Sequence, residues 1–75
     1  MYEILSGILV DELHLNASDV RPDANCEDAG LDSLAMVELS MILQQRLNMR
    51  ISDDELLATN RVADIVRMME ARANS

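Results

Sequence analysis

The sequence has no tryptophan or phenylalanine, and it contains one tyrosine, one cysteine, one proline and two glycines in 75 residues. Aromatic residues favour strands, so their near absence argues against a sheet. The single cysteine, Cys26, cannot form an internal disulfide, which excludes a disulfide scaffold and favours a cytoplasmic protein. No apolar run approaches the roughly 20 residues of a membrane span, and no basic segment opens the chain as in a secretory signal.

Positive charge is also scarce, since fourteen acidic residues stand against six basic ones and the formal net charge is −8. This charge repels nucleic-acid phosphates and anionic membranes, so we expect neither as a partner. It attracts proteins with basic patches, and through self-repulsion it favours a monomer. A chain this short forms one domain, residues 1–75, with too little interior for a deep catalytic cleft, so we expect no enzyme.

Apolar periodicity predicts an all-α fold, a small four-helix bundle of three longer helices and one short helix. The first helix is expected from Tyr2 to about His14, followed by one long loop over residues 15–31, which is rich in turn-forming residues. The second helix is expected from Ser33 to about Leu47, with Asp32 as its N-cap. So long a loop in a small domain is uncommon and indicates a functional role.

Capping residues mark the last two helices. Ser52 and Glu55 form a capping box that opens the short third helix, and Asn60 is expected to cap the fourth helix. The core is predicted to contain Leu5, Ile8, Leu9, Leu13, Val20, Leu39, Leu43, Leu47, Ile51, Val62, Ile65, Val66 and Met69.

The predicted helix over residues 33–47 has two apolar stripes where an amphipathic helix needs one. Met36, Leu39, Leu43 and Leu47 form one stripe, which suits the core. Leu34, Val37 and Met41 form the other stripe, beside Glu38 and Gln45. Methionine adapts to varied contacts, so we interpret the second stripe as a docking face, with cover by the short helix or the long loop as the alternative.

The run Gly30, Leu31, Asp32, Ser33 and Leu34 at the head of this helix resembles the attachment motif of acyl carrier proteins. The resemblance spans nearly the whole chain, including the first helix, the long loop, the segment of residues 37–39, the acidic capping box and the final helix. Alone, a short Asp-Ser-Leu motif is not specific, because helix starts favour such residues. With the other matching segments around it, and with this spacing to both chain ends, the motif is specific.

The resemblance implies that a phosphopantetheinyl transferase moves 4′-phosphopantetheine from coenzyme A to the hydroxyl of Ser33, and that cargo is held as a thioester on the terminal thiol. By the same resemblance, Asp32 helps to position the magnesium ion of the transferase, while the carrier needs no metal of its own. Gly30 is interpreted as the flexible residue that turns the loop into the helix. Leu34 is expected to contact the transferase and the base of the arm, or else to lie in the core.

Further partners implied by the resemblance are acyl-loading, condensing and tailoring enzymes with basic docking patches. Glu38, Asp53, Asp54 and Glu55 are the acidic residues expected to meet these patches, and each has an ordinary solvated role as its alternative. Surface ion pairs contribute about 0–1 kcal/mol each, so only their sum would select a partner.

Other functions are less well supported. Ser33 as a catalytic nucleophile lacks a base within the motif, so no catalytic residue is expected. His14 is interpreted as a residue at a helix end rather than a zinc ligand, and Cys26 as a small filler. An unmodified helical adaptor that binds proteins through the second stripe is the alternative from another class, although it has no need of the Ser33 hydroxyl.

Several positions depart from the pattern of fatty-acid carriers. The loop has Ala24, Asn25, Cys26 and Ala29 where larger apolar residues are common, and residues 44–46 (Gln, Gln, Arg) replace acidic ones. These departures favour a specialised, polyketide-type pathway over a housekeeping fatty-acid or aminoacyl carrier. They leave open whether the cargo enters the bundle. Met1 at the start of the first helix and the short tail after Arg72 favour a discrete protein.

Overall fold

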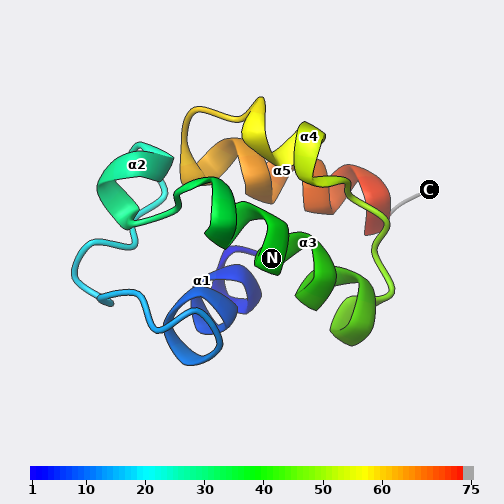
Figure 1. The fold of residues 1–75 in the computed structure, drawn as a ribbon, viewed down its shortest axis with the longest axis horizontal. Coiled ribbons are helices and arrows are strands. Elements are labelled where there is room, and N and C mark those ends of the chain that lie inside the picture. The colour runs from blue at the N-terminus through cyan, green and yellow to red at the C-terminus, as the bar shows by residue number, and fades with distance from the viewer. Residues whose placement is uncertain (74–75) are drawn as a thin grey trace.

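The computed structural model describes residues 1–73 and consists of five helices, shown in Figure 1. The helices are α1 (Tyr2–Asp11), α2 (Cys26–Ala29), α3 (Ser33–Leu47), α4 (Asp53–Leu57) and α5 (Val62–Ala73). α4 and α5 lie along one side of α3, α1 lies toward the other side, and α2 stands at the end where α3 begins (Figure 1). The all-α prediction is confirmed, with two short helices in place of one.

α1 ends earlier than the sequence predicts. Its last helical residue is Asp11 rather than His14, because the chain turns where His14 adopts a left-handed conformation (φ 58°). This turn lets the amide of Leu15 donate to the carbonyl of Leu9 (3.0 Å), which satisfies an acceptor at the helix end. α3 ends in the same way, with Asn48 at φ 54° and the amide of Met49 donating to the carbonyl of Leu43 (3.2 Å).

The predicted single loop over residues 15–31 contains the short helix α2, which its turn-forming composition concealed. The segment is also fixed to the start of α5 by backbone hydrogen bonds. The carbonyls of Ala24 and Pro22 accept from the amides of Val62 and Ala63 (3.1 and 2.9 Å). These bonds satisfy two donors of the first turn of α5, so the loop acts as part of the cap of that helix.

The bounds of α3 and the start of α4 agree with the predictions, and both caps are present. The Asp32 carboxylate accepts from the amide of Ala35 (2.8 Å), and Ser52 and Glu55 form the reciprocal capping box. The prediction for Asn60 is wrong. At the start of α5 the Asp64 carboxylate accepts from the amides of Asn60 and Arg61 (3.3 and 3.1 Å), so an acidic side chain inside the helix reaches back in place of an N-cap side chain.

The core lies between α1, α3, α4 and α5. Ten of the predicted core residues are buried, whereas Leu13, Leu47 and Val66 are partly buried at its edge. Met36 is buried as well, as expected from its place in the core-facing stripe of α3. The core also contains Cys26, Ala29, Leu31, Met49 and Leu56, which the sequence analysis did not predict as core residues. Most of these come from the two short helices and their flanking turns, which are too short to show a period.

Within residues 1–73 the only β-type pairing is an isolated bridge between Asn25 and Arg61. None of the helices in this range has the length and apolar character to cross a membrane.

Candidate functional site at the start of α3

Ser33 is the first residue of α3, and its side chain is exposed. The preceding residue, Asp32, has an extended backbone and uses one carboxylate oxygen to accept from the amide of Ala35. Among residues 1–73, the Ser33 hydroxyl takes part in no hydrogen bond. The local sequence therefore presents an uncommitted hydroxyl at the positive end of a 15-residue helix, where a negatively charged substituent is stabilised.

The turn that leads into α3 depends on Gly30. This residue ends α2 with φ 97°, and its amide bonds to carbonyls of α2. Leu31 follows and is buried, so the turn is fixed from below while Asp32 and Ser33 face solvent. Gly30 thus ends α2 as well as leading the chain into α3. The sequence predicted only the second role, because residues 15–31 were expected to form a loop without a helix.

A groove lies beside the Ser33 hydroxyl. It has a volume of about 450 Å³ and runs between the starts of α2 and α3 and the end of α4. We call it the Ser33 groove, and its lining residues are Cys26, Glu27, Leu31, Asp32, Ser33, Met36, Leu57 and Thr59. Cys26, Leu31 and Met36 are buried in its floor, whereas Leu57 is 46% exposed on its wall. A group attached to Ser33 therefore has an adjacent surface of mixed apolar and polar character.

The second apolar stripe of α3 is exposed. Leu34, Val37 and Met41 are 67%, 37% and 55% exposed, so neither α4 nor the loop covers them, and Leu34 is not a core residue. Glu38 is also exposed beside them. The stripe begins one residue after Ser33, which places an adaptable apolar surface next to the candidate attachment point.

The acidic residues of α4 differ in their availability. Asp54 is exposed and Asp53 is half-buried. The Glu55 carboxylate accepts from the amide and hydroxyl of Ser52 and forms an ion pair with Arg72. The Ser52 amide, followed by Arg72, lowers the pKa of Glu55 below its ordinary value. Glu55 is therefore committed to capping α4 and to holding α5, whereas within residues 1–73 the side chains of Asp53 and Asp54 form no hydrogen bond or ion pair.

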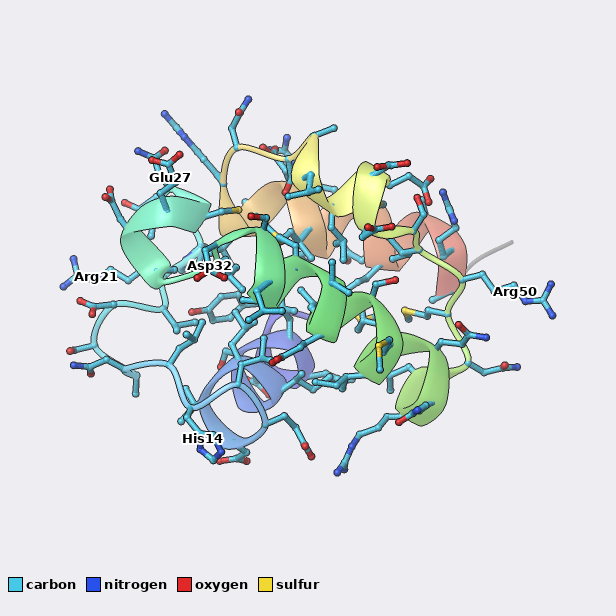
Figure 2. The ribbon with its side chains drawn as sticks, in the orientation of Figure 1. His14, Arg21, Glu27, Asp32 and Arg50 are labelled. Carbon is cyan, nitrogen blue, oxygen red and sulfur yellow. The ribbon has the colours of Figure 1, made fainter. Side chains whose placement is uncertain are left out.

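Cys26 and His14 occupy positions that give them no part in the candidate site's chemistry. Cys26 is buried, its Sγ lies 3.6 Å from the Thr59 hydroxyl, and burial raises the pKa of its thiol. A buried, protonated thiol is a poor nucleophile and acts as a small packing group. His14 lies exposed beyond the end of α1, away from the start of α3 (Figure 2). In residues 1–73, no three His, Cys, Asp or Glu side chains are arranged to hold a metal ion.

The structure brings Gly30, Asp32, Ser33 and Leu34 together at one end of the molecule, and Glu27 lies at the same end as Asp32 (Figure 2). Sequence reasoning missed the groove residues Glu27, Leu57 and Thr59. They come from two segments far apart in the chain, α2 and the end of α4 with the turn after it, which share no motif, so no signal in one sequence pointed to them.

Comparison with known proteins gives one consistent result. The family model described as a phosphopantetheine attachment site matches residues 3–69. The acyl carrier protein of Wolinella succinogenes is 34% identical to this chain over 71 residues, which cover 93% of each protein. The acyl carrier proteins of Helicobacter pylori (strain J99) and Solidesulfovibrio magneticus are 32% and 34% identical, each over 93% of this chain and 91% of the relative.

Proposed function

The chain belongs to the acyl carrier protein family, whose members carry cargo on phosphopantetheine and are not catalysts, and from this premise we propose that Ser33 holds the arm. The observation that supports this assignment is the uncommitted Ser33 hydroxyl at the first position of α3. The arm supplies a terminal thiol that forms a thioester with the cargo. Residues 1–75 would serve as one carrier domain.

The residues around Ser33 fit an esterified phosphate. The hydroxyl is exposed, so a transferase can reach it without unfolding α3. The helix start provides a positive dipole end for the phosphodiester. Asp32 keeps one carboxylate oxygen bonded to the Ala35 amide, and its remaining lone pairs face solvent, where they could help position the transferase's magnesium ion.

The experiment that tests the assignment is loading by a broad-specificity phosphopantetheinyl transferase with coenzyme A and magnesium, followed by intact mass measurement. The native chain and a Ser18→Ala variant are expected to gain one phosphopantetheine, because Ser18 is an exposed serine outside the site. Ser33→Ala is expected to gain none. Loading of Ser33→Ala, or failure of the folded native chain to load, would contradict the assignment and favour the unmodified adaptor.

We propose further that the exposed stripe of Leu34, Val37 and Met41 docks partner enzymes, with Glu38, Asp53 and Asp54 meeting their basic patches. These residues are near Ser33 in the chain or lie on α4, the helix that packs against α3. Glu55 is left out of this set because Ser52 and Arg72 already engage its carboxylate. The partners are the transferase and acyl-loading, condensing and tailoring enzymes, which a carrier in the cytoplasm would meet as a monomer.

We also propose that the pathway is specialised and polyketide-type rather than housekeeping fatty-acid synthesis. Gln44, Gln45 and Arg46 are exposed, and Arg46 forms an ion pair with Glu12, so this part of α3 offers partners little negative charge. Transfer assays with malonyl transferases from the two kinds of pathway test the proposal. Faster loading by the polyketide enzyme supports it, and faster loading by the fatty-acid enzyme contradicts it.

A further inference from the structure

The Ser33 groove continues into a second groove at the start of α5. The second groove has a volume of about 480 Å³ and shares Cys26, Glu27, Leu57 and Thr59 with the Ser33 groove. Its remaining lining residues are Asn25, Asn60 and Arg61, and we call it the Arg61 groove. The two grooves are therefore neighbours, and their combined lining extends from the start of α3 to the start of α5.

Two of the residues that line the Arg61 groove, Asn60 and Arg61, carry side-chain hydrogen-bond donors. Within residues 1–73, the guanidinium of Arg61 and the side-chain amide of Asn60 form no hydrogen bond or ion pair. Their backbone amides bond to the Asp64 carboxylate, and the Asn60 carbonyl accepts from the amide of Cys26 (2.9 Å), so the backbone that carries these donors is fixed. Glu27, which is exposed, is the acidic residue of the lining.

We propose that an acyl group carried on the Ser33 arm rests in the Arg61 groove, and that the groove selects short, oxygen-rich acyl groups. Carbonyl and carboxylate oxygens accept hydrogen bonds from guanidinium and amide groups, and the charged bond is the stronger one. An alkyl chain gains nothing from those donors and would remove water from them. This inference rests on the proposed attachment at Ser33.

The packing of the core disfavours a resting place for the acyl group inside the bundle. Leu39, Leu56 and Ile65 are completely buried. Cys26, Leu31 and Met36, which line the Ser33 groove, are also buried and belong to the same core. An alkyl chain that entered the bundle would displace these side chains from a closely packed interior, which is destabilising. The surface path requires no such displacement.

The test compares three forms of the chain, loaded by a transferase that accepts acylated coenzyme A: free-thiol, malonyl and hexanoyl. Intact mass first establishes that each group is attached. Amide and methyl NMR spectra then locate each acyl group relative to the free-thiol form. Arg61→Gln is the test variant. Arg50→Gln is its matched control, since Arg50 is exposed and lies at the opposite end of the molecule from Glu27 and Asp32 (Figure 2).

The malonyl form is expected to shift the amide signals of Thr59, Asn60 and Arg61, and the hexanoyl form to shift them less. Arg61→Gln should reduce the malonyl shifts toward those of the free-thiol form, and Arg50→Gln should leave them unchanged. The inference would be overturned if the loaded Arg61→Gln variant showed malonyl-induced shifts as large as those of the native chain. It would also be overturned if the malonyl group shifted only the signals of core methyl groups. A chain that takes up no group at all would instead contradict attachment at Ser33, and the inference with it.

Discussion

At the scale of single residues, Gly30 is the position where the backbone constrains the candidate site most. Its φ of 97° is one that side chains rarely adopt, and a Cβ there would lie 3.0 Å from Cδ2 of Leu15. A single residue thus determines both how α2 ends and how the chain reaches Ser33. Gly7 provides a contrast, because it lies inside α1 with nothing within 4 Å of an added Cβ.

Gly30→Ala is expected to lower the free energy of unfolding by about 1–2 kcal/mol, the cost of a left-handed non-glycine residue. Gly7→Ala is expected to raise it by about 0.5–1 kcal/mol, because alanine loses less backbone entropy in a helix. Urea denaturation monitored by circular dichroism measures both. A Gly30→Ala variant as stable as the native chain would contradict the close approach to Leu15.

At the scale of helices and turns, the ends of α1 and α3 share one device, a non-glycine residue in the left-handed conformation. His14 and Asn48 adopt φ values of 58° and 54°, and each is followed by an amide that bonds back into its helix. Asparagine and histidine occur in this conformation more often than most other non-glycine residues, whereas glycine adopts it without a steric cost.

His14→Gly is expected to stabilise the fold relative to His14→Ala by about 1 kcal/mol, since both changes remove the imidazole and only glycine relieves the backbone. Comparison of the two variants in thermal denaturation isolates the backbone term. Equal melting temperatures would show that the left-handed turn after α1 carries no strain.

The start of α4 predicts a dependence of stability on pH. The pKa of Glu55 is below its ordinary value of 4.5, so its contribution to stability is present above that value and is lost as the pH falls through the folded-state pKa. Glu55→Gln should therefore be less stable than the native chain at neutral pH, and this difference should shrink in acid. Glu70→Gln is the control, because Glu70 is exposed on α5. Denaturation series at several pH values measure the difference, and a constant value would contradict the capping role.

The accuracy of the sequence predictions follows the length of each element. α3 was predicted with its N-cap because fifteen residues show a period and Asp32 is a strong capping residue. α2 was missed because four residues show no period, and its burial of Cys26 and Ala29 depends on packing with distant segments. Asn60 was misassigned because the donors at the start of α5 are satisfied by Asp64 and by loop carbonyls, contacts that only the folded chain creates.

The same limit applies to the candidate site. The motif around Ser33 is local, so Gly30, Asp32, Ser33 and Leu34 could be proposed together from the sequence alone. The grooves beside it combine residues from the loop, α4 and the start of α5, and no local pattern links Glu27, Thr59 and Arg61.

At the scale of the whole molecule, the chain is an acidic bundle that presents the proposed attachment point, Ser33, and an apolar stripe on one helix. A carrier must leave one enzyme to reach the next, so its interfaces should be small and its encounters should be steered by charge. The net charge of −8 and the exposure of Leu34 and Met41 agree with such transient docking.

Met41→Ala is expected to reduce kcat/KM for loading by the transferase by about tenfold, as removal of an apolar anchor at an interface does. Ile4→Ala is the matched control, because Ile4 is a similarly exposed apolar residue on α1, outside the proposed docking stripe. Both variants should unfold like the native chain. If kcat/KM for loading were the same for Met41→Ala and Ile4→Ala, the proposal that the stripe docks the transferase would be contradicted.

The most direct test of the central claim is to find the modified residue itself. After loading with coenzyme A, the chain is digested and the peptide that contains Ser33 is fragmented in a mass spectrometer. We expect one phosphopantetheine, attached to Ser33, and no modified peptide from elsewhere in the chain. A phosphopantetheine on any other residue, or an unmodified Ser33 peptide from a fully folded and loaded sample, would contradict this claim.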